Sequence, residues 1–276
     1  MDSSLSIYVV TYRPDLGLVA QLLDTVRDSV ALCTSKGLLS DCNVTVIDNS
    51  TNEKIKDRLS ELIKTATLAS FGPINLQFAE QNLGYGRAHN RAIRGSNSRY
   101  HLVLNPDVLL EKEALYEGLR FMEAHPEIGL LTPYVADPRG ERLYLCKRYP
   151  TVLDLFLRGF APSGLRIRFA QRMDHYEMRD LDPEQVATGI PIASGCCMLV
   201  RNQLLQRLGG FDPRFFLYFE DFDLSLRMSK MADIAYVPAV KITHYGGEAA
   251  RKGPRHVFWF MRSAVRFFNL HDWKWW

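Results

Sequence analysis

The strongest constraint on the fold of this chain is the alternation of short apolar runs with helix-like segments in its first 110 residues. Apolar runs without helical spacing predict buried strands. Four such runs occur, at residues 5–12, 43–48, 74–79 and 100–104. Amphipathic or charged segments, typical of helices, separate them, among them residues 16–30 and 53–64. Strands that alternate with helices in this way predict right-handed βαβ units and a largely parallel sheet.

The remaining sequence continues this mixed pattern without a convincing linker or internal repeat. It predicts a helix and three further strands, at residues 111–124, 128–132, 192–200 and 234–237. A length of 276 residues suits one α/β domain. We expect that domain at residues 1–250, with a nucleotide-binding half (1–110) and a catalytic half (111–250). A basic, aromatic segment (251–276) follows it.

The composition excludes several classes of protein. With 47% hydrophobic and 24% charged residues the chain is globular, and a net charge of only +3 gives no electrostatic case for binding nucleic acid. An odd number of cysteines, five, without a C-x-x-C pair or a signal peptide predicts a reducing, cytoplasmic setting. No apolar run approaches the ~18 residues that cross a bilayer. Any membrane contact is therefore expected to be peripheral, on the inner face of the cytoplasmic membrane.

A carboxylate follows the fourth predicted strand. Pro106 cannot donate a hydrogen bond to a sheet, so the strand ends there and Asp107 lies at its carboxyl end. Open α/β sheets bind their ligands at this edge. Mg²⁺ or Mn²⁺, shared by a carboxylate and a diphosphate, would suit this place. The alternative is an Asn-Pro-Asp turn whose side chains satisfy only nearby backbone groups.

Three acids in four positions, Glu220, Asp221 and Asp223, follow the aromatic run at residues 215–219. Carboxylates against apolar rings are partly desolvated, which raises their basicity and suits a general base. The alternative is structural, because the acids can cap the next helix and Asp223 can pair with Arg227 at i, i+4. Both interpretations hold together if Asp221 is chemical and Asp223 structural.

Two further features lie next to predicted strands. Gly84 and Gly86 open a helix, and this helix start with Arg87 favours a phosphate, although the third glycine of a dinucleotide-binding loop is missing. His244 follows the last predicted strand. A lone histidine is more often structural than a metal ligand, so His244 becomes a ligand candidate only if it meets Asp107.

Two segments mix aromatic and basic residues. Between Arg251 and Trp276 there are six Lys or Arg against one acid. This mixture suits an anionic membrane surface, or a terminal helix that docks its aromatic face on the core. Residues 148–172 carry a similar mixture, which is typical of a partner-facing segment as much as of a core segment.

Together these motifs resemble the family 2 glycosyltransferases with the GT-A fold, and the resemblance covers nearly the whole chain. It is most specific at Asn105-Pro-Asp107, at residues 210–224 (Gly-Phe-Asp-x5-Tyr-Phe-Glu-Asp-Phe-Asp-Leu) and at His244. Within the family the chain is most similar to bacterial rhamnosyltransferases that build cell-surface polysaccharide, through residues 84–90 and the Arg148-Tyr-Pro segment.

The resemblance implies roles for the candidate residues. Asp221 is the catalytic base, and Glu220 beside it contacts acceptor or donor. Asp107 coordinates the metal, and His244 completes its shell. The implied donor-binding residues are Thr11, Tyr12, Arg13, Asp48, Asn82, Gly84, Arg87, Asn90 and Asn105. Within this set Asp48 accepts a hydrogen bond from a pyrimidine base.

Two positions depart from the family pattern. Asn105 replaces the first acid of the D-x-D motif, so fewer negative charges surround the metal and its affinity is expected to be modest. Glu248 stands near the glycines at a place where relatives often keep a serine, which removes an expected phosphate contact.

The resemblance implies an inverting glycosyl transfer with Mg²⁺ or Mn²⁺ in cell-surface polysaccharide or lipopolysaccharide assembly. The donor is dTDP-L-rhamnose, with a UDP-sugar as second choice, and the acceptor is a saccharide or a polyprenyl-linked saccharide. Two other classes stay open. A nucleotidyltransferase shares the fold but usually has a basic, Gly-rich loop after the first strand, unlike residues 11–15. A non-catalytic assembly subunit that binds nucleotide sugars needs no acid cluster.

Overall fold

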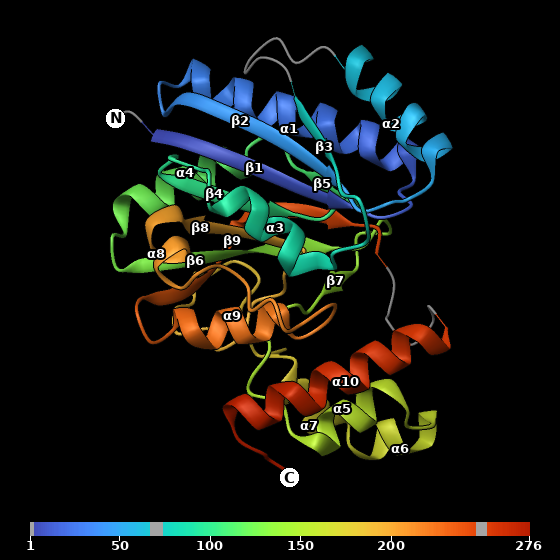
Figure 1. Cartoon of the computed structure of the whole chain (residues 1–276). Coiled ribbons are helices and arrows are strands. Elements are labelled where there is room, and N and C mark those ends of the chain that lie inside the picture. Colours follow the sequence, from blue (N-terminus) through green and yellow to red (C-terminus); the bar gives the residue numbers. More distant parts are fainter. Residues whose placement is uncertain (1–2, 67–73, 247–252) are drawn as a thin grey trace.

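The computed structural model describes residues 3–66, 74–246 and 253–276, and shows a central sheet between two layers of helices (Figure 1). Over these residues the sheet has nine strands in the order β3-β2-β1-β4-β8-β6-β9-β5, and β7 pairs with β6. The strands are β1 (Ser3–Thr11), β2 (Leu39–Asp48), β3 (Asn75–Phe78), β4 (Tyr100–Leu104), β5 (Val108–Leu110), β6 (Ile128–Ala136), β7 (Arg142–Leu143), β8 (Cys197–Arg201) and β9 (Asp233–His244).

The direction of the strands confirms the expected mixed, mostly parallel sheet. β2 and β4 are both parallel to β1, and β3 is parallel to β2. β8 is antiparallel to both β4 and β6, and β9 is parallel to β6. Hence β1, β2, β3, β4, β6 and β9 run one way, while β5, β7 and β8 run the other way.

Helices cover both faces of the sheet. On one face lie α1 (Leu16–Ser35), α2 (Glu53–Thr65) and α4 (Ala114–Ala124), and on the other α3 (Tyr85–Ile93), α8 (Asn202–Arg207) and α9 (Glu220–Met228). Asp15 begins α1, because its side chain accepts hydrogen bonds from the N–H groups of Gly17 and Leu18. The predicted helices at 16–30, 53–64 and 111–124 correspond to α1, α2 and α4.

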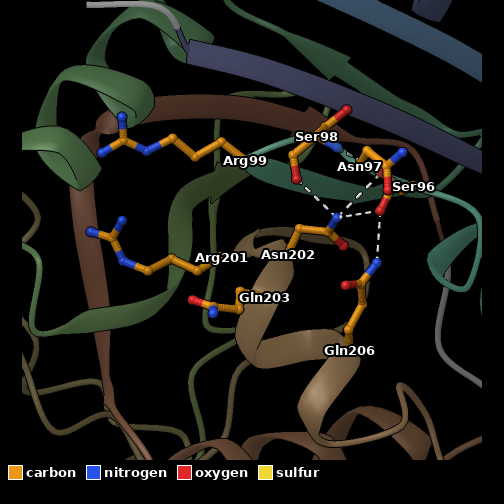
Figure 2. Close-up of a pocket in the computed structure, with 8 residues that line it drawn as sticks. All are labelled: Ser96, Asn97, Ser98, Arg99, Arg201, Asn202, Gln203 and Gln206. Atoms are coloured by element: carbon orange, nitrogen blue, oxygen red, sulfur yellow. Dashed lines mark hydrogen bonds between the residues drawn. The ribbon is translucent and has the colours of Figure 1, made fainter.

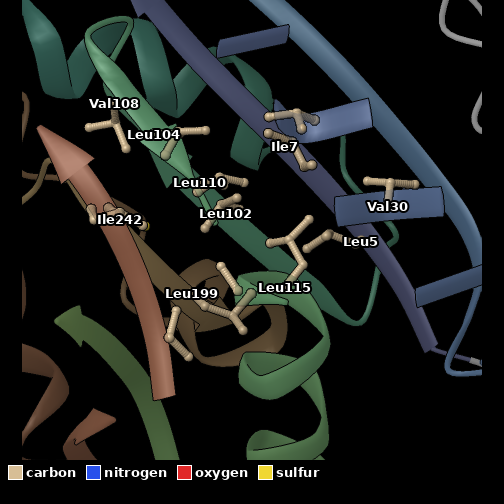
Figure 3. Packing of buried hydrophobic residues seen from close by; sticks show 14 of the residues in the cluster. Leu5, Ile7, Val30, Leu102, Leu104, Val108, Leu110, Leu115, Leu199 and Ile242 are labelled. Carbon is tan, nitrogen blue, oxygen red and sulfur yellow. The ribbon is translucent and has the colours of Figure 1, made fainter. Parts of the chain in front are cut away.

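The central strand β4 has the predicted bounds and is buried on both faces. Leu102 and Leu104 belong to the core beneath α1 and α4 (Figure 3), whereas Val103 belongs to the core beneath α3, α8 and α9. Successive side chains of a strand point to opposite faces. A strand covered on both sides therefore reads as an unbroken apolar run, which is why residues 100–104 were predictable.

A helical lobe, built from residues 149–176 and 253–276, packs on the side of α9 that faces away from the sheet (Figure 1). It contains α5 (Val152–Gly159), α6 (Ser163–Arg168), α7 (Ala170–Tyr176) and α10 (Pro254–His271). Its core joins both segments through Leu157, Tyr176 and Phe267, and connects to the aromatic run through Phe215 and Phe219. The structure thus shows a docked inner face for the terminal helix and a packed role for residues 148–172.

Some sequence expectations need correction. The strand predicted at 192–200 begins only at Cys197. The residues before it turn toward α9 instead, since Ala193 N–H donates to Ser225 Oγ. The three-residue strand β5 was missed because it is too short for a periodic signal.

Two sequence features concern residues whose structure is not described: Glu248, and the cations Arg251 and Lys252, lie outside the described residues. The five cysteines are free and buried. Over the described parts of the chain, no helix is both long and apolar enough to cross a membrane.

Candidate active site

The end of β4 brings Asp107 next to His244. After Leu104 the chain leaves β4, and β5 begins at Val108, which pairs with His244 at the end of β9. Asp107 Oδ1 lies 3.3 Å from His244 Nε2. The short strand β5 is therefore what joins these two candidate ligands, which are 137 positions apart in the sequence.

The backbone after β9 closes around this pair. Tyr245 N–H donates to the carbonyl of Asp107 at 2.8 Å. A Cβ on Gly246 would lie 2.4 Å from His244 Nε2 and 2.9 Å from Asp107 Oδ2, so only glycine fits without displacing them. Among the described residues no group of three or more Asp, Glu, His or Cys could hold a metal ion. Two protein ligands suit Mg²⁺ or Mn²⁺ if substrate phosphates and waters supply the others.

Asp221 lies in the first turn of α9 and is held by backbone N–H groups. Its Oδ2 accepts a hydrogen bond from Gly195 at 2.8 Å, and its Oδ1 accepts one from Phe222 at 3.0 Å. The two residues before Glu220, Tyr218 and Phe219, have φ values of 70° and 65°. Left-handed backbone is costly for aromatic residues. The packed aromatic run around them holds this turn, which presents both acids at the start of α9.

Burial raises the pKa of both acids above the ordinary values. Glu220 is buried, its Oε2 has no hydrogen-bond partner among the described residues, and the charge of Asp221 raises its pKa further. Burial also raises the pKa of Asp221, but its two N–H donors and the charge of Arg158 oppose that rise. Hydrogen bonds to an ionised carboxylate favour its charge. The surroundings of Asp221 therefore favour its charged form more than the surroundings of Glu220 do.

Short contacts connect the surroundings of Asp221 to the turn that carries Asp107. Tyr85 Oη donates to the carbonyl of Gly195 at 2.6 Å, and the carbonyl of Cys196 accepts from Asn105 N–H at 2.8 Å. Burial raises the pKa of Cys196 to about 12, and the charges of Asp107 and Asp221 both contribute. Tyr85 is likewise near Glu220, Asp221 and Asp107, whose charges add to the effect of burial on its pKa. The candidate metal ligands and the candidate base thus lie close together, near residues 195 and 196.

A second group of candidate site residues surrounds the Asp48 carboxylate at the ends of β1 and β2. Thr11 Oγ1 and Ser50 Oγ donate to its Oδ1 at 2.7 and 2.9 Å. Its Oδ2 is buried without a hydrogen-bond partner in the part of the chain that the structure describes. Arg13 N–H donates to Ser50 Oγ, and the Arg13 guanidinium lies over the exposed ring of Tyr12. Asp48 therefore keeps one free acceptor atom, with Tyr12 and Arg13 at the rim.

The glycine loop before α3 sits between these two groups. Asn82 Oδ1 accepts from Gly84 N–H, and Asn49 Nδ2 donates to the carbonyl of Gly84. Gly84 has φ 82°, and a Cβ there would lie 2.2 Å from the carbonyl oxygen of Phe216. This glycine is needed because the loop is pressed against the aromatic run.

Two predicted donor-binding residues on α3 make contacts within the protein. The Asn90 amide makes two hydrogen bonds with the backbone of Phe211. Its Nδ2 donates to the Phe211 carbonyl at 2.7 Å, and its Oδ1 accepts from the Phe211 N–H at 2.9 Å. Arg87 is exposed, and its Nε donates to the carbonyl of Pro213. Both side chains hold the loop that precedes the acid cluster.

The structure also identifies site residues that the sequence motifs did not reveal. Gly195 donates its N–H to Asp221, and Tyr85 donates its hydroxyl to the carbonyl of Gly195, contacts that span 26 and 110 positions. No local pattern predicts such contacts. Asp223 takes the predicted structural role: it pairs with Arg227 at 2.6 Å, and also meets His271 of α10 at 2.9 Å.

A polar cavity of about 380 Å³ lies elsewhere, at the amino end of β4 (Figure 2). It is lined by Ser96, Asn97, Ser98, Arg99, Arg201, Asn202, Gln203 and Gln206. The Asn202 amide donates to the carbonyls of Ser96 and Ser98, and the Arg201 guanidinium donates to backbone carbonyls including that of Met122. These groups fasten a loop to α8. The candidate active site remains the group of carboxylates near the other end of β4.

Comparison with known proteins adds a family and a fold. The model of glycosyl transferase family 2 matches residues 6–209. The N-acetylglucosaminyl-diphospho-decaprenol L-rhamnosyltransferase of Mycobacterium tuberculosis is 25% identical, over 100% of this chain and 87% of its own length. The Escherichia coli rhamnosyltransferase WbbL is 25% identical, over 67% of this chain and 69% of its own.

A solved structure is similar over nearly the whole chain. That structure is GalNAc-T7 with UDP, GalNAc and Mn²⁺, which superposes with a TM-score of 0.65 at 15% identity and covers 97% of this chain. This chain spans only about half, 48%, of the GalNAc-T7 chain. At this level of identity the similarity concerns the fold.

Proposed function

Because this chain belongs to glycosyl transferase family 2 and has the GT-A fold, we propose that it transfers a sugar from a nucleotide donor to an acceptor hydroxyl with inversion. L-rhamnose from dTDP-L-rhamnose is the favoured donor, since both similar proteins are rhamnosyltransferases. A UDP-sugar is the second choice. The observation that supports the proposal is that the adjacent residues Gly195 and Cys196 contact Asp221 and Asn105, which brings Asp221 close to the Asp107–His244 pair.

The proposed proton transfer follows from the two acids of α9. Asp221 is the more readily ionised, because Gly195 and Phe222 donate to it, while Glu220 stays protonated in its buried position. As the acceptor oxygen bonds to the anomeric carbon, its proton passes to Asp221. The bond from that carbon to the diphosphate oxygen breaks, and its electron pair leaves with the nucleoside diphosphate. A single displacement of this kind inverts the anomeric centre.

Asp107 and His244 are the residues proposed to hold a divalent metal. Their oxygen and nitrogen atoms converge beside Gly246, and a Cβ at that residue would fill the space they face. When bound, Mg²⁺ or Mn²⁺ neutralises charge that develops on the leaving diphosphate. Asn105 lies in the turn next to these ligands, where we propose that it contacts the donor.

The donor nucleotide is proposed to bind at the ends of β1 and β2. The free Oδ2 of Asp48 would accept the ring N–H of thymine or uracil, with Thr11 holding the carboxylate in place. Tyr12 and Arg13 would cover the base from the rim. Both pyrimidines carry that N–H, so Asp48 does not select between dTDP- and UDP-sugars.

The loop before α3 is proposed to contact the sugar and diphosphate. Asn82 and Gly84 offer backbone and amide groups in the loop itself, and Arg87 offers a cation at its exposed edge. Asn90, whose amide is fully used by Phe211, would act by holding this wall of the site.

The acceptor is proposed to be a saccharide or polyprenyl-linked saccharide in cell-surface polysaccharide assembly. The similar mycobacterial protein is named for a diphospho-decaprenol acceptor. We place the reaction on the inner face of the cytoplasmic membrane, where a peripheral enzyme meets both a water-soluble donor and a lipid-linked acceptor.

Asp221→Asn tests the assignment of the base. The amide keeps the shape of the side chain but cannot take a proton at neutral pH, so acceptor-dependent nucleotide release should fall by about 10² to 10⁴. Donor binding, measured by calorimetry, should stay within about twofold of wild type, because Asp221 contributes to the chemical step. Asp233→Asn, at an exposed position at the start of β9, is the matched control.

The same assay separates the other two classes of function. A glycosyltransferase releases nucleoside diphosphate only when an acceptor is supplied. A nucleotidyltransferase would instead release pyrophosphate from a nucleoside triphosphate and a sugar phosphate, and a binding subunit would release neither. Full turnover in Asp221→Asn would remove this residue from the proposed role.

A further inference from the structure

Exposed apolar side chains gather on the helical lobe. Among the described residues fifteen large hydrophobic side chains are exposed, and ten of them belong to the lobe. These ten are Phe156, Phe160, Ile167, Phe258, Met261, Val265, Leu270, Trp273, Trp275 and Trp276. Scattered exposed hydrophobic residues are normal, but a concentration in one region marks an interaction surface.

The helix α10 has two apolar faces. One face, with Ala264, Phe267 and Phe268, is buried in the core of the lobe. The other face carries Phe258 and Val265, which are 59% and 45% exposed. Met261 lies between them at helical spacing, so these three side chains form an outer stripe. Packing of the lobe accounts for the inner face alone.

The residues that follow α10 are held in place. Tyr149 Oη donates to the carbonyls of His271 and Asp272, and Val152 N–H donates to the carbonyl of Lys274. The Trp273 ring stacks on Phe268, and the Trp275 ring stacks on Trp273. These indoles are therefore presented by a packed surface, although water could reach them.

The lobe is also cationic. Residues 149–176 and 253–276 contain eight Arg or Lys (Arg158, Arg166, Arg168, Arg172, Arg255, Arg262, Arg266 and Lys274) against three Asp (Asp154, Asp174 and Asp272), a net charge of 8 − 3 = +5. Arg255 and Arg262 are exposed beside the outer stripe of α10. The remainder of the chain must then carry 3 − 5 = −2. The positive charge thus coincides with the exposed aromatic residues.

We infer that the outer stripe of α10 and the tryptophans beyond it form a docking surface for an anionic lipid bilayer. Phe258, Met261 and Val265 enter the boundary between headgroups and acyl chains, and Arg262 contacts lipid phosphates. Aromatic residues with arginines on one helix face suit this boundary. The inference deepens the proposed function and rests on it only for the lipid-linked acceptor. Docking on the bilayer would bring this acceptor to the candidate active site.

Charge favours a bilayer over a second copy of this chain. Two copies meeting through this face would bring like charges together, which costs free energy. Binding to an anionic membrane is instead strengthened by each basic residue near its surface.

Vesicle binding of the full chain tests this inference. We expect it to sediment with vesicles of phosphatidylcholine containing phosphatidylglycerol, less with pure phosphatidylcholine, and less again at high salt. The double change Phe258→Ser with Met261→Ser should weaken binding about tenfold or more, because it removes apolar contacts with the acyl boundary. Arg262→Glu should weaken binding to the anionic vesicles only.

The matched control is Val186→Ser with Met231→Ser, two similarly exposed side chains outside the lobe, which should leave vesicle binding unchanged. Turnover on a soluble saccharide acceptor should be the same in all these variants, so loss of docking is distinguishable from loss of catalysis. The inference would be overturned if the wild-type chain did not bind anionic vesicles, or if the lobe variants bound these vesicles as well as the wild type does. It would also be overturned by a wild-type dimer that the lobe variants abolish.

Discussion

At the scale of single residues, Gly246 controls how Asp107 and His244 face each other. A Cβ at this position would lie 2.4 Å from His244 Nε2, closer than real contacts allow. Gly246→Ala must therefore push the imidazole or the loop away from Asp107. We expect metal-dependent donor binding to weaken by about 10- to 100-fold, the usual range when support for metal ligands is lost. Calorimetry with Mn²⁺ and a nucleotide sugar would measure it.

Gly95→Ala provides the control for this change. Nothing lies within 4 Å of a Cβ at Gly95, so the substitution should leave donor binding with Mn²⁺ as in wild type. Donor binding without metal should also be similar in both variants, because Gly246 does not touch Asp48. If Gly246→Ala binds donor and Mn²⁺ normally, the Asp107–His244 pair is not the metal site.

The residues of the candidate active site differ in how well the sequence alone predicts their positions and contacts. Asp107 and the Glu220-Asp221 pair stand out because each follows a strongly apolar or aromatic run. For Asp107, chain direction alone predicts a place at the sheet edge. Asn90 was expected to contact the donor, yet its amide is used by the backbone of Phe211. Its partner is 121 positions away, so only the folded structure reveals what its side chain contacts.

At the scale of elements, α5 carries a cation, Arg158, whose charge acts on the candidate base Asp221. Arg158 lies on this helix, 3.8 Å from Glu177, and its charge lowers the pKa of Asp221. Arg158→Ala removes that charge, so the pKa of Asp221 should rise and the base should ionise only at higher pH. The acid limb of the pH profile of turnover is then expected to move to higher pH, while donor affinity stays unchanged.

A charge-retaining variant makes this test specific. Arg158→Lys should keep the acid limb near its wild-type position, and Arg168→Ala, an exposed arginine on α6, should not move it. An equal shift in all three variants would mean that global charge, rather than α5, acts on Asp221. A profile that does not move in Arg158→Ala would contradict the proposed coupling.

Helices and strands were predictable where a single segment has an uninterrupted hydrophobic pattern of its own. The strand at 100–104 and the helix at 16–30 have uninterrupted patterns, and both appear in the structure as β4 and α1. The strand β5 depends on pairing with β9. In the short helices α5, α6 and α7, only the buried and partly buried apolar residues pack against α10 and the aromatic run. Their signal lies in contacts between distant segments, so residues 148–172 stayed ambiguous.

At the scale of the whole molecule, buried ionisable groups should make stability depend on pH in two opposite ways. His89 on α3 and His101 in β4 are fully buried, and neither ring has a hydrogen-bond partner among the described residues. Burial lowers the pKa of His101 to about 3, and also lowers the pKa of His89 well below 6.5. Glu220 has the opposite shift, because burial raises its pKa above 4.5.

The sign of each effect follows from which state binds the proton. As pH falls below about 6.5, histidines of the unfolded chain take up protons that His89 and His101 cannot accept, so the free energy of unfolding falls. Glu220 works the other way, because its proton is lost first from the unfolded chain. As pH rises above about 4.5, this group therefore lowers the free energy of unfolding. The two effects oppose each other between these limits.

His101→Phe separates the histidine contribution. A phenyl ring can keep the stacking on Tyr8, where the ring centroids lie 4.6 Å apart, but it does not titrate. Urea unfolding between pH 7 and pH 4 should show that wild type loses stability faster than this variant, by up to about 1.4 kcal/mol per pH unit for one such group. His175→Gln, at an exposed position, should follow the wild-type slope. Parallel slopes for wild type and His101→Phe would mean that His101 is protonated in the folded protein, and that a water or rearranged partner satisfies its ring.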